Sequence, residues 1–160
     1  MSIRTRPAES GDLPLIAGLI RELAEYEKLS EKVRFDVAEL GNNLFGPNPA
    51  VEALIGEVDD VPQGFALFFT TFSTFEGRPG LWLEDLFVRE PARGLGLGRA
   101  LLQAVATEAV GRGFARLEWS VLDWNTPAIG FYRKLGAQPM DGWTTMRLEG
   151  TMLAVTGAKG

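Results

Sequence analysis

Three glycines alternate with larger residues in the stretch Arg93-Gly94-Leu95-Gly96-Leu97-Gly98. An apolar strand pattern precedes it over residues 81–88, and an amphipathic helix pattern follows over 99–110. Glycine lets the backbone approach an anion closely, and the first N–H groups of a helix point toward negative charge. This placement predicts an anion-binding loop for a cofactor that carries a pyrophosphate. The alternative is a tight connection without a ligand.

Two consecutive carboxylates, Glu84 and Asp85, lie inside the apolar strand pattern. Neighbouring residues of a strand point to opposite faces, so at most one of them can address a given cleft unless a bulge intervenes. The apolar residues around them indicate a central strand, where a purely solvent-facing acid is less expected. Acid–base chemistry is the functional interpretation, and a pair of exposed acids at a strand end is the alternative.

The chain contains no cysteine and no histidine. This excludes disulfides, Cys/His zinc sites, thiolate nucleophiles and catalytic pairs built on histidine. Proton transfer must therefore use carboxylates, tyrosine or lysine, and we predict no metal site. A group carried by a cofactor could not rest on a cysteine, so its transfer should be direct between two bound substrates.

The elements that position these residues follow from periodicity and turn chemistry. Strands expected first, followed by strand–helix–strand units around a Gly-rich turn, indicate an α+β domain with a mixed sheet. We expect one domain over residues 1–160. The expected elements are a strand over 3–6, a helix over 13–24 capped by Asp12, a loop or helix end over 26–35, a helix opened by a capping box of Asp36 and Glu39, an antiparallel meander of 51–58, 64–72 and 81–88, a helix over 99–110, a strand over 114–122, a helix over 126–135 and a closing β segment over 143–155.

The glycine loop resembles motif A of the GNAT superfamily of acyl-CoA-dependent N-acetyltransferases. Further pieces resemble its diamine (spermidine/spermine) acetyltransferase branch, and the resemblance covers nearly the whole chain. These pieces are Ala24-Glu25-Tyr26-Glu27, Leu83 to Val88, Asp123-Trp124-Asn125, Phe131-Tyr132 and Gly142-Trp143. The resemblance implies a mostly antiparallel mixed sheet, splayed at the centre and flanked by helices, with acetyl-CoA as co-substrate.

By this resemblance, the loop amides and Arg93 or Arg99 hold the CoA pyrophosphate, and the backbone of residues 86–88 pairs with the pantetheine arm. Asn125 and Thr126 could hold the same arm through amide and hydroxyl groups. The expected cofactor-binding residues are Leu86, Phe87, Val88, Arg93, Gly94, Leu95, Gly96, Leu97, Gly98, Arg99, Asn125, Thr126, Ala128 and Tyr132.

Acetyl transfer to an amine must remove a proton from an ammonium, stabilise an oxyanion and protonate a thiolate. The resemblance implies that Tyr132 donates a proton to the CoA sulfur; packing beside Phe131 is the alternative. Glu84 is the first candidate for the base, working through water, and Asp85 is the second. The expected acceptor-binding residues are Tyr26, Glu27, Glu84, Asp85, Trp119, Asp141 and Trp143. The acceptor stays open among polyamines, diamines and thialysine-like amines, because Asp141 stands where the branch has the longer Glu.

Charge is distributed unevenly along the chain. Residues 1–90 carry 16 acidic and 8 basic residues, whereas residues 91–160 carry 5 acidic and 8 basic ones. This suits a cationic acceptor on one side and an anionic cofactor on the other. With a pI near 4.8 and no basic stripe, we expect no nucleic acid partner. The polar, basic start of the sequence and the lack of a long apolar run lead us to expect no membrane association and a cytoplasmic location. The family resemblance implies a homodimer. The competing hypotheses are a non-catalytic CoA-binding sensor and a protein N-acetyltransferase.

Overall fold

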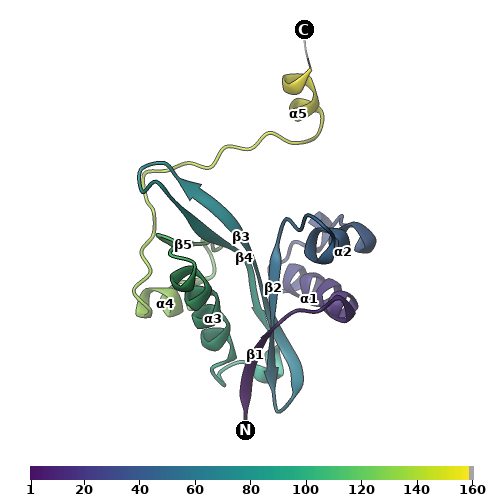
Figure 1. The fold of residues 1–160 in the computed structure, drawn as a ribbon, viewed down its shortest axis with the longest axis vertical. Helices are drawn as coiled ribbons and strands as arrows, with labels where there is room; N and C mark the ends of the chain where they lie inside the picture. Colours follow the sequence, from purple (N-terminus) through teal and green to yellow (C-terminus); the bar gives the residue numbers. More distant parts are fainter. Residues whose placement is uncertain (159–160) are drawn as a thin grey trace. The chain divides into compact units, whose positions relative to one another are not determined.

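The computed structural model describes residues 1–158. The chain divides into two compact units, Met1–Leu122 and Asp123–Gly160. A single domain over the whole chain stays a prediction. Figure 1 shows the elements, which are β1 (Ile3–Pro7), η1 (Ser10–Asp12), α1 (Leu13–Tyr26), η2 (Ser30–Lys32), α2 (Val37–Phe45), β2 (Glu52–Val58), β3 (Val61–Ser73), β4 (Arg78–Val88), η3 (Glu90–Ala92), α3 (Leu97–Gly111) and β5 (Leu117–Glu118) in the first unit, and α4 (Thr126–Lys134) and α5 (Gly150–Gly157) in the second.

The five strands of the first unit form one sheet in the order β1-β2-β3-β4-β5. The first four pair antiparallel, and β5 pairs parallel with β4. The predicted meander and the mixed, mostly antiparallel sheet are therefore confirmed. The turn between β2 and β3 consists of Asp59 and Asp60, both in the left-handed region at φ 49° and 64°. Two such residues give a hairpin turn whose twist matches that of the strands.

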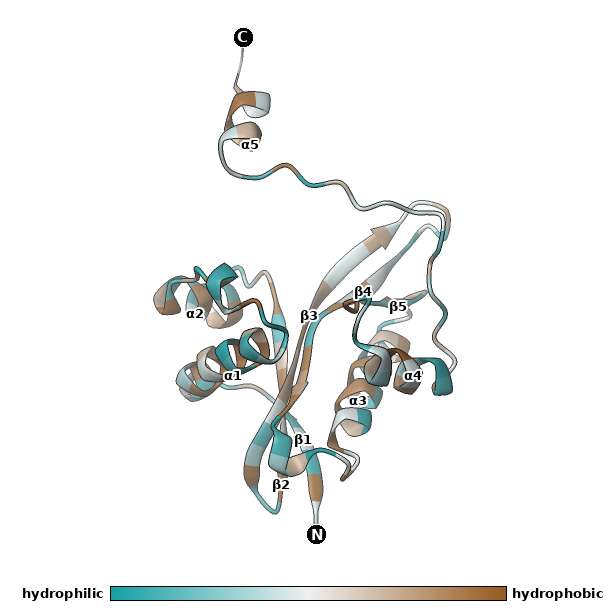
Figure 2. Cartoon of the chain, turned by 180° about the vertical axis from the view of Figure 1, so that it is seen from behind, coloured by the Kyte–Doolittle hydropathy of each residue, from teal (hydrophilic) through white to brown (hydrophobic). Residues whose placement is uncertain are grey.

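Helices cover both faces of this sheet: α1 and α2 lie on one face and α3 lies on the other (Figure 1). Apolar residues of α1, α2 and the strands form the core on the first face, and they include Ile16, Leu19, Leu44, Ile55, Phe65 and Phe87. On the other face, Gly56 lets α3 approach the sheet, because a side chain there would meet Leu97 at 2.8 Å. In Figure 2 the helices beside the sheet carry both hydrophobic and hydrophilic residues, as expected for helices with one face on a core.

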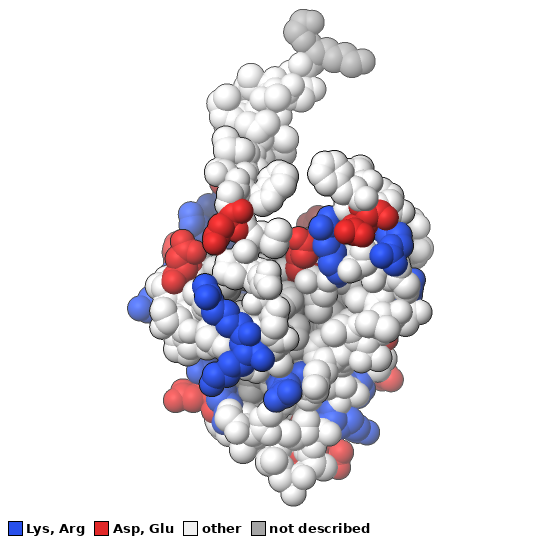
Figure 3. All heavy atoms as spheres, turned by 90° about the vertical axis from the view of Figure 1, so that its left-hand side faces the viewer, with Lys and Arg blue, Asp and Glu red and all other residues white. Residues whose placement is uncertain are grey.

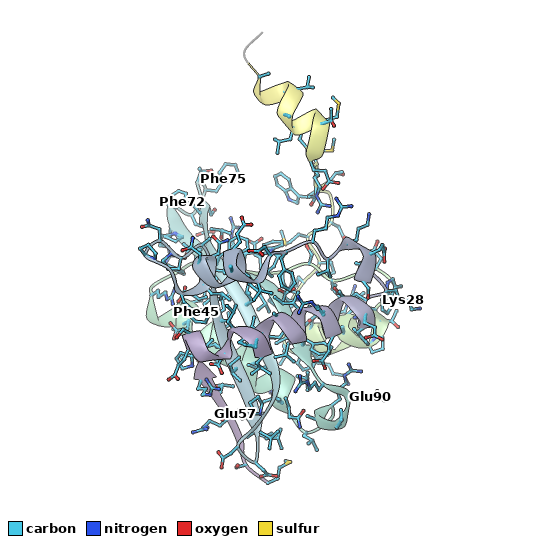
Figure 4. All side chains as sticks on the ribbon, turned by 90° about the vertical axis from the view of Figure 1, so that its right-hand side faces the viewer. Lys28, Phe45, Glu57, Phe72, Phe75 and Glu90 are labelled. Atoms are coloured by element: carbon cyan, nitrogen blue, oxygen red, sulfur yellow. The ribbon has the colours of Figure 1, made fainter. Side chains whose placement is uncertain are left out.

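The edge strand β1 is held by a buried carboxylate. Glu57, only 4% exposed, accepts hydrogen bonds from Arg4 Nε and Arg6 Nε, each at 2.9 Å. Arg6 also donates to Asp12 at 2.8 Å. Asp12 stands at the N-cap of α1 as expected, but its side chain makes no cap hydrogen bond, because it pairs with Arg6 and accepts from the backbone N–H of Glu9. The ion-pair network therefore replaces the predicted cap, and Figure 4 labels Glu57 at its centre.

The start of α2 follows the prediction closely. Asp36 is the N-cap and its carboxylate accepts from the backbone N–H of Glu39 at 2.9 Å. At the far end of the sheet, two aromatic rings are exposed, Phe72 near the end of β3 and Phe75 in the turn that follows, and Figure 4 labels both.

The strand predicted over 114–122 is much shorter, since β5 pairs with β4 only at Leu81 and Trp82. The pairing ends where β4 bulges, two residues further on. A bulge disrupts the ladder and bends the strand. Within the described residues, no strand pairs with this side of β4 from Leu83 to Val88, so the sheet opens there as the family resemblance implies.

The second unit contains α4 over nearly the predicted range, but the β segment predicted over 143–155 is wrong. Residues 143–149 have no regular structure, and α5 occupies Gly150–Gly157. No strand of the described chain pairs with this segment. A helix satisfies its backbone hydrogen bonds within one segment, whereas a strand needs a neighbour. None of the helices in residues 1–158 has both the length and the apolar composition of a membrane span.

Candidate active site

Strand β4 bulges at the predicted carboxylate pair. Leu67 lies opposite Asp85 and Phe68 lies opposite Leu83, so Glu84 is an extra residue without a partner of its own. The bulge breaks the alternation of the strand, and Glu84 and Asp85 both line the same pocket. Glu84 is exposed and accepts a hydrogen bond from the indole N–H of Trp82 at 3.0 Å, whereas Asp85 is half-buried.

This pocket, which we name the α1–β4 pocket, has a volume of about 370 Å³. Its size lies in the range of small-molecule sites. One wall is the C-terminal half of α1, a second is the segment that follows α1, and the third is the bulge of β4. The lining residues are Ile20, Leu23, Ala24, Glu27, Leu29, Lys32, Val33, Arg34, Phe35, Glu84 and Asp85.

The end of α1 determines where Glu27 lies. Lys28 adopts the left-handed conformation at φ 60°, and the backbone N–H groups of Lys28 and Leu29 donate to the carbonyls of Glu25 and Ala24. This is a Schellman motif, which terminates the helix and reverses the chain. Figure 4 labels Lys28 at this turn. Glu27 therefore stands at the negative end of the helix dipole, where a cation is favoured.

An ion pair joins α1 to the end of β4. Arg89 Nη2 lies 2.8 Å from a carboxylate oxygen of Glu22, and Arg89 Nε also donates to the same carboxylate at 3.0 Å. A guanidinium that binds a carboxylate through two nitrogens fixes direction as well as distance. The pair therefore ties α1, whose C-terminal end carries Glu27, to β4, which carries Glu84 and Asp85.

The carboxylates of the pocket influence each other. Burial, and after it the charges of Glu84 and Glu27, raise the pKa of Asp85 to about 7. Burial also raises the pKa of Glu27. A carboxyl group with a pKa near neutrality in a pocket is suited to accept a proton from a substrate.

The glycine loop has the backbone that an anion site requires. Gly94 and Gly96 have φ angles of 78° and 95°, and Gly96 is the N-cap of α3. Both are exposed, and so is Arg99 in the first turn of α3. The first N–H groups of α3 lack intrahelical acceptors, so they are available to a phosphate. Leu97, in contrast, is buried against the sheet and contributes only its backbone.

Arg93 connects the glycine loop with the end of α1 and with β4. Its guanidinium lies 4.7 Å from the ring centre of Tyr26 and 5.7 Å from that of Phe87. Its Nε donates to the carbonyl of Val88 at 2.9 Å. Stacking on aromatic rings holds the guanidinium in place. The predicted cofactor residues Arg93, Phe87 and Val88 are thus brought together with the predicted acceptor residue Tyr26.

In the second unit, Asn125 is buried and caps α4, because its side-chain oxygen accepts from the backbone N–H of Ala128 at 3.4 Å. The family resemblance assigns this side chain only to the cofactor. The rings of Tyr132 and Phe131 lie 5.5 Å apart. Asp141 and Trp143 are exposed. Their roles, like those of Thr126 and Tyr132, stay predictions. Trp119 of the first unit is half-buried and does not line the α1–β4 pocket.

Sequence reasoning missed two cations of the pocket, Lys32 and Arg34. They lie in the segment expected only to be a loop or helix end, and no periodicity marks them. Figure 3 shows one face of the molecule, on which Lys and Arg side chains gather in a group and Asp and Glu side chains are also present. Because charged side chains of both signs are common at the surface, Lys32 and Arg34 do not stand out in the sequence.

Three comparisons identify related proteins. Residues 19–137 match the acetyltransferase (GNAT) family. The thialysine N-epsilon-acetyltransferase of Bos taurus is 38% identical over 92% of this chain and 93% of its own length. The L-ornithine N5-acetyltransferase of Arabidopsis thaliana is 32% identical over 96% of this chain and 87% of its own length.

Solved structures show the same fold. An integron cassette protein from the mobile metagenome of V. cholerae superposes with a TM-score of 0.81 at 26% identity, over 99% of both chains. An aminoglycoside acetyltransferase from an uncultured soil metagenomic sample gives a TM-score of 0.76 at 18% identity, over 92% of this chain and 97% of its own. The second similarity concerns the fold alone.

Proposed function

The chain belongs to the acetyltransferase (GNAT) family and transfers an acetyl group from acetyl-CoA to small amines, and on that premise we propose that the acceptor amine binds in the α1–β4 pocket. The observation that carries the proposal is the bulge of β4, because it allows both Glu84 and Asp85 to line the same pocket as Glu27. Three carboxylates and the negative end of α1 attract an ammonium group. The acceptors named for the relatives, thialysine and ornithine, both carry such a group.

We propose that Asp85 is the base and that Glu84 binds the acceptor, which reverses the order drawn from the sequence. Two observations support this choice. Asp85 is half-buried with a pKa of about 7, and Glu84 is exposed and already accepts a hydrogen bond from Trp82. A base with a pKa near the working pH combines a useful ionised fraction with sufficient proton affinity.

The first unit offers a site that fits acetyl-CoA. Left-handed glycines at 94 and 96, unpaired amides at the start of α3 and the guanidinium of Arg93 suit the pyrophosphate, and the open edge of β4 from Leu83 to Val88 suits an extended amide-bearing chain. When bound, acetyl-CoA supplies an activated acetyl thioester. Asn125, Thr126, Ala128 and Tyr132 stay proposed contacts of the same co-substrate, as do the homodimer and the cytoplasmic location.

The test is a panel of acceptors with acetyl-CoA, monitored by release of free thiol. It should contain a diamine, an amino acid with a side-chain amine, an uncharged alcohol of similar length and a peptide with a free N-terminus. We expect acetylation of the two cationic small molecules and a loss of at least about 10²-fold in kcat/KM in Asp85→Asn, the lower range for a general base. Preferred acetylation of the peptide, or unchanged turnover in Asp85→Asn, would contradict the proposal.

A further inference from the structure

The α1–β4 pocket carries carboxylates on two of its walls and cations on the third. Glu27, Glu84 and Asp85 come from the end of α1 and from β4, whereas Lys32 and Arg34 come from the segment that follows α1. Among the described residues, no ion pair uses Lys32 or Arg34. Both side chains are exposed. The carboxylates of the pocket therefore leave the two cations free for another anion.

We propose that Lys32 and Arg34 bind the carboxylate of the acceptor, so that the preferred acceptor is an amino acid with a side-chain amine rather than a diamine. This inference rests on the proposed function, because it concerns the same pocket. An amino acid presents its carboxylate to the cationic wall and its side-chain ammonium to the carboxylates of the other two walls. Both kinds of acceptor bring a second ammonium toward Lys32 and Arg34, but in the amino acid the adjacent carboxylate offsets the repulsion between like charges, whereas in the diamine nothing does.

The two cations contribute differently to this selection. The guanidinium of Arg34 can bind a carboxylate through two nitrogens, whereas the ammonium of Lys32 acts as a point charge. Since both are exposed, solvent weakens their interaction with the acceptor. An exposed pair is worth up to about 1 kcal/mol, which corresponds to roughly a 5-fold effect on kcat/KM for each residue. Arg34 is expected at or above this value and Lys32 at or below it.

The experiment compares two acceptors that differ only in the carboxylate: L-lysine and 1,5-diaminopentane. The quantity measured is the ratio of kcat/KM for lysine to kcat/KM for the diamine. In Arg34→Gln this ratio should fall about 5-fold or more, and in the double variant with Lys32→Gln about 10-fold or more. Arg34→Lys should recover part of the loss, because it keeps the charge. Arg78→Gln, which removes an exposed cation outside the pocket, should leave the ratio unchanged.

Each outcome bears on the inference in a defined way. If wild-type protein acetylates both acceptors and the ratio does not change in the variants, the inference is overturned while the proposed function stands. If the ratio changes equally in Arg78→Gln, net charge rather than the pocket is responsible, which also overturns it. If wild-type protein releases thiol with neither acceptor nor any other small amine, the proposed function fails first. Thermal melting of each variant separates loss of recognition from loss of fold.

Discussion

Replacing Asp85 with Asn should increase stability while it removes activity. Burial and two neighbouring carboxylates raise the pKa of Asp85 from 3.8 to about 7. The folded protein therefore binds this proton more tightly than the unfolded chain does. Where the folded state binds more protons, the free energy of unfolding falls as pH rises. The loss begins near pH 4, is complete a little above pH 7 and is absent in a variant that cannot ionise.

The size of the effect follows from the pKa. A shift of one pKa unit corresponds to 1.36 kcal/mol, so about 3 units give an upper bound of roughly 4 kcal/mol. Solvent reaches part of the Asp85 side chain and screens its neighbours, which reduces the expected gain to about 2 kcal/mol at pH 8. Asn has nearly the same shape, and its amide N–H can donate to Glu84 or Glu27. At pH 4 the gain should disappear, since Asp85 is then protonated in the folded state.

Urea unfolding of wild-type protein and Asp85→Asn at pH 4 and pH 8 measures this difference. Asp123→Asn is the matched control, because Asp123 is exposed and does not line the α1–β4 pocket. A stability difference near zero at both pH values would refute the claim that Asp85 is held in a desolvated, acidic environment. A stabilised variant with near-normal turnover would keep the environment but refute the role of Asp85 as base.

Three further predictions concern other parts of the molecule. Gly98→Ala should weaken binding of acetyl-CoA at least 10-fold in calorimetric titration, because its new methyl group crowds the first turn of α3. The melting temperature should not fall, since the methyl group meets only ordinary contacts. Gly111→Ala, on the same helix, should leave binding unchanged. Glu57→Gln should lower the free energy of unfolding by about 1 to 3 kcal/mol at pH 7. The arginines beside Glu57 hold its pKa below the usual range, so this difference should shrink below about pH 4.5, and a difference that stays constant would contradict the ion-pair account. Tyr132→Phe should lower turnover about 10²-fold with little effect on acetyl-CoA binding, and near-normal turnover at every pH would identify Tyr132 as a packing residue.

The parts of the fold that were predicted correctly depend on local signals. The capping residue Asp36, the alternation in β2 to β4 and the helical spacing of α1 each act over a few residues, so the sequence alone reveals them. The glycine loop was recognised for the same reason. Asp12 shows the limit of this reasoning, because its cap interaction is replaced by an ion pair with Arg6, a residue of another element.

Features that depend on pairing between distant residues were not predictable. The sequence allowed a bulge at Glu84 but could not place it, because the bulge is defined by the register against Leu67 and Phe68 of β3. The strand expected over 143–155 failed for a related reason: β-branched and apolar residues favour a strand only where a partner strand is present. Within the described residues that partner is absent, so residues 143–149 have no regular structure and α5 follows over Gly150–Gly157.

The raised pKa of Asp85 and the proposed affinity for an ammonium share one physical cause, the repulsion among the carboxylates of the pocket. Burial of Asp85 is the largest cause of its raised pKa, and repulsion from Glu84 and Glu27 in the α1–β4 pocket adds to it. An arriving ammonium offsets the repulsion, so a feature that lowers stability becomes a source of binding energy. An ammonium near Asp85 also lowers its pKa, which keeps the carboxylate ionised when the acceptor is in place. After the amine gives up its proton, the positive charge is gone and the high proton affinity of Asp85 returns. In its proposed role, Asp85 is therefore ionised before proton transfer and retains the proton afterwards.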